Sequence, residues 1–92
     1  MCSEWSSAPA LALLEEMEND PQGYGWLDVQ KLLELWGVVD PLPGEDLMGY
    51  ETRLHPRARD IIFYYPMREE LGPETVLTIC RSLRRLQHRL SA

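Results

Sequence analysis

The sequence predicts an α+β domain in which a three-stranded antiparallel sheet has two helices on one face, with an additional helix at the N-terminus. Residues 60–65 are rich in β-branched and aromatic residues, which favours a strand. Pro73 and Glu74 then open an amphipathic pattern that extends to about Leu90, and proline and an acid in the first turn are typical of a helix start. A length of 92 residues with 45% hydrophobic content fits one domain, residues 1–92.

Two further helices are expected before the sheet. Ser7 is the candidate N-cap of the first helix, which should end near Asn19. Asp28 is the candidate N-cap of the second, Val29–Trp36, whose apolar residues recur at intervals of three and four. Gly37 follows as the residue that ends this helix.

Three segments are expected to form the strands. Val38–Val39 begins a short strand, and the two prolines and the glycine of Asp40–Asp46 should interrupt it. Met48–Leu54 and Ile61–Tyr65 are the longer strands. The polar stretch that starts at His55 connects them as a hairpin turn.

The pattern of side chains along the two long strands predicts an interface. In the first of them, Glu51 is expected to point outward, because side chains alternate along a strand. In the second, both faces are apolar or aromatic, whereas a solvated face would alternate with charged residues. Ile62 and Tyr64 therefore need a cover, for which the N-terminal helix and a second copy of the chain are the candidates.

Charge is divided unevenly along the chain. Residues 1–50 carry ten acids and one lysine, a net −9, and residues 51–92 carry eight arginines and five acids, a net +3. One interpretation is that the two halves neutralise each other, with Glu15, Glu16 and Glu18 as acidic partners, or that both are solvated faces. The other is a surface for RNA phosphates or an acidic partner. Its candidate residues are Arg53, Arg81, Arg84, Arg85 and Arg89.

From Val29 to about Leu86, the order of elements and several residues resemble the HicA family of mRNA interferase toxins. This resemblance implies a fold like that of double-stranded-RNA-binding domains (dsRBD-like) for residues 26–92, with residues 1–25 as an N-terminal helical extension. The matching residues are Leu32-Leu33, Trp36-Gly37, His55-Pro56, Arg59, Glu70-Leu71, Pro73, Thr75, Ile79 and Leu83.

The chain departs from this family at the catalytic signature. Gly49, Tyr50 and Glu51 stand where the family has a Ser-His-His segment, and Met48–Leu54 contains no histidine. Glu51 could act as a general base and His55 as its acid partner. The two lie four residues apart, about 13 Å along an extended strand, which is too far for concerted work on one phosphodiester unless the turn folds back. We therefore assign no catalytic residue.

Other classes of site are not expected. Two histidines and two separated cysteines, Cys2 and Cys80, do not have the spacing of a metal site, and no cofactor motif is present. Cys80 is expected to be a small core residue. The absence of a basic N-terminal region and of a long apolar run predicts a cytoplasmic protein without membrane contact.

Three functions remain open. The first is a HicA-like domain without the catalytic histidine, a non-catalytic binding module for RNA or a protein partner. The second is an active RNA-cleaving toxin of a toxin–antitoxin pair, whose partner would be an antitoxin-like protein. The third is an interaction or self-association domain with no role in nucleic-acid binding, which the net charge of −6 favours over an RNA binder.

Overall fold

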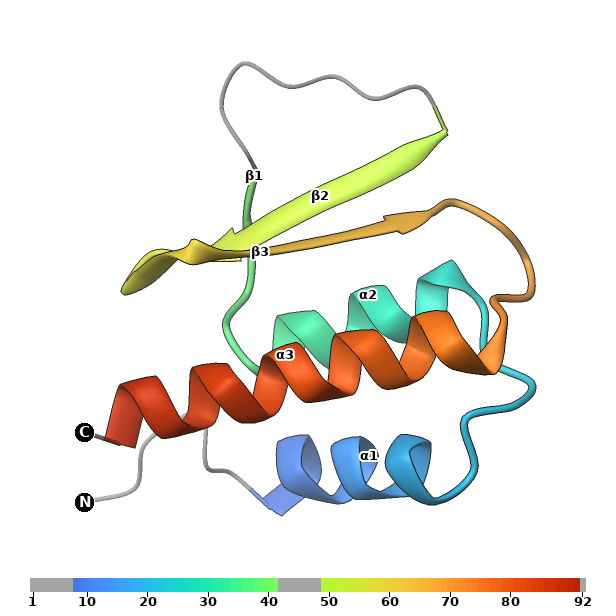
Figure 1. The fold of residues 1–92 in the computed structure, drawn as a ribbon, viewed down its shortest axis with the longest axis horizontal. Coiled ribbons are helices and arrows are strands. Elements are labelled where there is room, and N and C mark those ends of the chain that lie inside the picture. The colour runs from blue at the N-terminus through green and yellow to red at the C-terminus, as the bar shows by residue number, and fades with distance from the viewer. Residues whose placement is uncertain (1–7, 42–48, 92) are drawn as a thin grey trace.

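The computed structural model describes residues 8–41 and 49–91. In this part of the chain, three helices and a three-stranded antiparallel sheet confirm the α+β class. Met48 and the candidate N-cap Ser7 lie outside the described residues. In chain order, the elements are α1 (Ala8–Asn19), α2 (Trp26–Leu35), β1 (Asp40–Pro41), β2 (Tyr50–His55), β3 (Ala58–Pro66) and α3 (Pro73–Ser91) (Figure 1).

The sheet has the strand order β1-β2-β3, so β2 is central and β3 is an edge strand. Asp40 pairs with Leu54 and Pro41 with Arg53. The prediction that Val38–Val39 begins the short strand and that Asp40 interrupts it is therefore wrong, because Val38–Val39 precedes β1 and the strand forms at Asp40–Pro41. Proline lacks a donor for a central ladder, but β1 is an edge strand, where this loss is tolerated.

Helix α2 begins three residues earlier than predicted, because its N-cap is Gly25 and not Asp28. Asp28 is the third helical residue, and its Oδ2 accepts a hydrogen bond of 2.8 Å from the Gly25 N–H. The predicted end is confirmed: Gly37 has φ +76° and its N–H donates to Glu34 O at 3.1 Å. A left-handed glycine of this kind is a common helix terminator.

The helices lie below the β2–β3 hairpin in the view of Figure 1, with α1 farthest from the strands. α3 contacts β3, and α1 contacts both α2 and α3. The Trp36 indole N–H also donates to Ala10 O at 3.1 Å and joins the end of α2 to the start of α1. The expectation that the N-terminal helix covers Ile62 and Tyr64 is wrong, since both remain exposed.

One apolar cluster joins all three helices to the sheet. Cys80 is buried in it, as predicted. Its members include Leu14 and Met17 from α1, Leu32, Leu33 and Trp36 around α2, Ile61, Phe63 and Tyr65 from β3, and Val76, Ile79, Leu83 and Leu86 from α3. Among the described residues, no helix has the length and apolar character needed to cross a bilayer.

Candidate functional site

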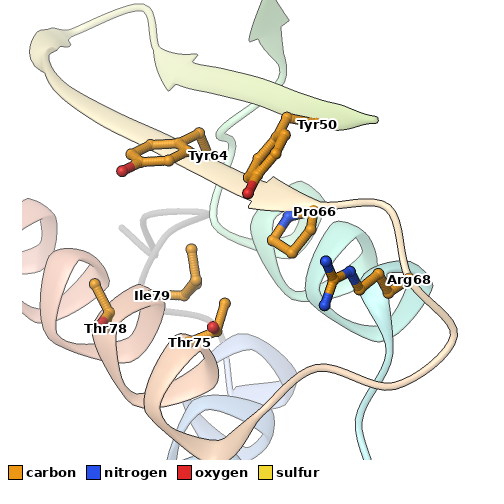
Figure 2. A pocket seen from close by; sticks show the side chains of 7 residues that line it. All are labelled: Tyr50, Tyr64, Pro66, Arg68, Thr75, Thr78 and Ile79. Carbon is orange, nitrogen blue, oxygen red and sulfur yellow. The ribbon is translucent and has the colours of Figure 1, made fainter. Parts of the chain in front are cut away.

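A hollow of about 410 Å³ lies between the end of the β2–β3 hairpin and the first half of α3. In Figure 2 the rings of Tyr50 and Tyr64 stand on one side of this space, and three side chains of α3 stand on the other. We call this hollow the β3–α3 groove. Its lining consists of Tyr50, Tyr64, Pro66, Arg68, Thr75, Thr78 and Ile79.

The hairpin register places the two tyrosines together. Tyr50 pairs with Pro66 and Thr52 pairs with Tyr64, so all four side chains leave the same face of the sheet. The centroids of the two rings are 6.1 Å apart and the rings are tilted by 44°, within the range of favourable aromatic pairs. Both remain accessible, since Tyr50 is 42% and Tyr64 59% exposed.

Backbone hydrogen bonds fix the position of Arg68 at one end of the groove. Its N–H donates to Pro66 O at 2.9 Å, and its carbonyl accepts from the Trp26 N–H at 3.0 Å. The Leu71 N–H further donates to Tyr24 O at 2.8 Å. The start of α2 therefore holds the segment between β3 and α3, while the Arg68 side chain is exposed and forms no ion pair within the described residues.

Glu51 points toward the helices, so the prediction that it points outward is wrong. Its carboxylate accepts hydrogen bonds from Gln30 Nε2 of α2, from Arg53 Nε at 3.1 Å and from the Tyr65 hydroxyl. Burial and this carboxylate raise the pKa of Tyr65 well above its ordinary value. The Glu51 carboxylate thus accepts hydrogen bonds from three side chains of the protein. These residues form a polar network between the sheet and α2 in which the carboxylate is satisfied.

His55 is nearly buried and has a local partner of its own. Its Nδ1 accepts a hydrogen bond of 2.9 Å from the Arg57 N–H, so it stabilises the hairpin turn. Burial, followed by the charge of Arg57, lowers the pKa of His55. The polar partners of Glu51 and of His55 are therefore different residues, and the two do not form an acid–base pair.

The arginines of α3 do not form one uninterrupted cationic surface. Arg84 donates two hydrogen bonds, of 2.9 and 2.7 Å, to the Glu18 carboxylate of α1. Arg89 donates to Asp60 of β3 at 2.8 Å. Arg81 and Arg85 are exposed and form no ion pair in the part of the chain that the structure describes.

The remaining predicted binding residue, Arg53, lies between two acids. Its Nε contacts Glu51 at 3.1 Å, and its Nη1 lies 3.6 Å from Glu34. Arg53 therefore faces α2, and its ion-pair partners belong to α2 and β2, not to α3. Residues 8–41 and 49–91 contain no group of three or more His, Cys, Asp or Glu side chains that could hold a metal ion.

No protein-family model, curated protein or solved structure matches this chain.

Sequence reasoning found part of this site. Ile62 and Tyr64 are exposed apolar residues, at 46% and 59% exposure, and the prediction that they form an interface stays a prediction. Tyr50 was aligned with a lost catalytic position, and its partnership with Tyr64 follows only from the strand register. Sequence reasoning did not place Arg68, Thr75, Thr78 or Ile79 in a site, and Thr75 and Ile79 were named only for the family resemblance. The contact between β3 and α3 is what brings these residues together.

Proposed function

We propose that this chain is a non-catalytic binding module that recognises a protein partner through the β3–α3 groove. The observation that carries the proposal is the exposed pair Tyr50 and Tyr64 at the wall of this groove. Exposed aromatic residues that border a hollow are typical of protein interfaces. In this proposal, the chain is a cytoplasmic HicA-like domain with a dsRBD-like fold, and it lacks the catalytic histidine of that family.

The order α2-β1-β2-β3-α3 supports the dsRBD-like part of the proposal. The partners of Glu51 and His55 support the non-catalytic part, because each side chain is committed to internal hydrogen bonds. An active RNA-cleaving toxin remains the alternative, and it would need other residues for acid–base chemistry.

Charge favours a protein partner over RNA. Two of the four α3 arginines are engaged by Glu18 and Asp60, and the whole chain carries a net −6. An RNA surface gains affinity by releasing counterions from phosphates. Arginines that already pair with carboxylates contribute less to that release, and nearby acids repel phosphate.

Site-specific crosslinking tests the proposal. A photoreactive amino acid at Tyr64, in cells of the source organism, is expected to give an adduct of higher mass that ribonuclease treatment leaves unchanged. The same group at Leu27, which is 60% exposed and outside the groove, is the matched control. An adduct sensitive to ribonuclease, or equal crosslinking at both positions, would contradict the proposal.

An RNA titration tests the alternatives. With labelled single-stranded and duplex RNA, we expect no binding at ~20 mM salt, where phosphate contacts are strongest, and no cleavage of a mixed mRNA pool. Binding at low salt that weakens about equally for all sequences in an Arg84→Ala/Arg85→Ala variant, with a salt dependence flatter by roughly one to two units of slope, would establish an RNA surface instead. Cleavage of mRNA that disappears in Glu51→Ala or His55→Ala would establish the alternative function, an active RNA-cleaving toxin.

A further inference from the structure

We infer that the β3–α3 groove receives an extended segment of the partner protein, which adds to β3 as a fourth strand and places an acidic side chain at Arg68. This inference rests on the proposed protein-binding function and specifies the chemistry of the partner. It combines three features of the described residues: an open strand edge, the exposed aromatic pair Tyr50 and Tyr64 beside it, and a cation at the end of the groove.

The edge of β3 has unused backbone groups. The Met67 N–H donates to Gly49 O at 2.8 Å, and hydrogen-bonded and non-hydrogen-bonded pairs alternate along an antiparallel ladder. The pairs Glu51–Tyr65 and Arg53–Phe63 are therefore the hydrogen-bonded ones. The backbone groups of Ile62 and Tyr64 consequently point away from β2, and within the described residues nothing pairs with that side of β3.

The length of the open edge is limited. Pro66 lacks an N–H and closes one end, while Asp60, which binds Arg89, marks the other. Ile62 and Tyr64 lie between these limits. An added segment of about three to five residues fits this interval at the usual rise of a strand.

The wall of the groove suits alternate side chains of such a segment. Tyr64 is 59% exposed and stands across the groove from α3 (Figure 2), so an aliphatic or aromatic side chain of the segment can pack on its ring. The Thr78 hydroxyl donates to Glu74 O at 2.9 Å and is already engaged. Arg68, which forms no ion pair in the described part of the chain, supplies the charge that an acidic side chain complements.

A second copy of this chain fits the edge less well. α3 makes its contacts with the sheet chiefly at β3, so each of two copies paired through β3 would bring its own α3 helix to the joint. A single extended segment has no helix to accommodate.

Selection from a random library of dodecapeptides on the full chain tests this inference, and the tightest synthetic peptide from it serves as the probe. We expect enriched peptides to combine β-branched or aromatic residues with an acid. Binding should shift the Ile62 and Tyr64 amide signals in ¹H–¹⁵N spectra and slow their hydrogen exchange. Arg68→Glu should weaken binding about tenfold or more, and the matched reversal Arg81→Glu, on an exposed residue outside the groove, should leave it unchanged.

N-methylation of the probe provides a test that does not depend on the folding of a variant. Methylation of every second peptide amide should abolish binding in one register and not in the other, because only alternate amides face an adjacent strand. Absence of enrichment, equal tolerance of both registers, or no response of the Ile62 amide would overturn the strand addition. Peptide binding that depends on Tyr64 but tolerates methylation in both registers would contradict the strand addition and still support the proposed protein-binding function. RNA binding at low salt would contradict the proposed protein-binding function itself.

Discussion

At the residue scale, the polar side chains that resembled remnants of catalysis have structural roles. Glu51 gathers donors from α2, β2 and β3, and His55 accepts the Arg57 N–H within the hairpin turn. Among the described residues, no buried side-chain N or O atom lacks a hydrogen-bond partner. Substituting these residues should therefore change stability more than any chemical activity.

The Tyr65 hydroxyl provides the first prediction. It donates to the Glu51 carboxylate, and a hydrogen bond to a charged group contributes about 1.5–3 kcal/mol. Tyr65→Phe should lower the free energy of unfolding by about that amount in urea denaturation. Tyr64→Phe, at the exposed neighbour, should stay within about 0.5 kcal/mol. Equal effects of the two substitutions would show that the Glu51 network does not stabilise the fold.

The two histidines provide a prediction about pH. Burial and Arg57 lower the pKa of His55 from its ordinary 6.5, so the unfolded chain takes up a proton at a higher pH than the folded chain does. Stability is then complete above about pH 6.5 and falls as the pH decreases through that value. The melting temperature should therefore decrease between about pH 7.5 and 5.5, a window above most carboxylate titration.

Variants at the two histidines identify the source of this effect. His55→Asn keeps an acceptor for the Arg57 N–H and should flatten the pH dependence of the melting temperature in that window. His88→Asn, at an exposed position of α3, should leave the dependence unchanged. If only the His88 variant flattened the curve, the structural role assigned to His55 would be wrong.

At the scale of elements, the start of α2 and the segment between β3 and α3 support each other. Gly25 is the N-cap of α2, and its α-carbon lies against the backbone of Glu69. The neighbouring hydrogen bonds from Trp26 to Arg68 and from Leu71 to Tyr24 hold the same two segments together. One end of the β3–α3 groove therefore depends on a contact with α2.

Substituting Gly25 tests this dependence. A Cβ at Gly25 would overlap the Glu69 carbonyl, whereas a Cβ at Gly72 meets no atom within 4 Å. Gly25→Ala should separate the segments and lower stability by about 1–3 kcal/mol, as overpacking does. Gly72→Ala should be neutral or slightly stabilising. The free energies of unfolding of the two variants check this, and similar values for both would contradict the close approach.

At the scale of the whole molecule, α1 is part of the core and not an appendage. Ala10, Leu14 and Met17 are fully buried, and Glu18 of the same helix binds Arg84 of α3. Because α1 contacts the other helices, it stabilises the domain while leaving Ile62 and Tyr64 exposed. This arrangement leaves one face of the hairpin available for a partner.

The contribution of α1 can be measured with two leucines. Leu14→Ala removes a fully buried side chain and should lower the free energy of unfolding by about 2–5 kcal/mol. Leu27→Ala, at a residue that is 60% exposed, should change it by less than about 0.5 kcal/mol. A change below 1 kcal/mol for Leu14→Ala, measured by denaturant unfolding, would mean that α1 does not share the cooperative core.

Local sequence was sufficient for most of the secondary structure, but not for the start of α2 or for the position of the short strand β1. The long helix from Pro73, the glycine that ends α2 and the two strands of the hairpin were all predicted, because helix and strand periods and helix caps depend on residues within a few positions of one another. The start of α2 was placed late, since Asp28 acts from inside the helix as an acceptor for Gly25 and both positions suit an aspartate.

Long-range packing fixed the orientation of these elements, and therefore the candidate site. The alternation of side chains along β2 correctly predicted that Glu51 and Tyr50 lie on opposite faces of the strand. The face with Glu51 is the one toward the helices, because Gln30, Arg53 and Tyr65 donate hydrogen bonds to Glu51 there. A period of two defines two faces without saying which one is buried. The position of α1, the pairing of Arg84 with Glu18 and the groove beside Arg68 likewise depend on contacts between residues far apart in the chain, which no local pattern encodes.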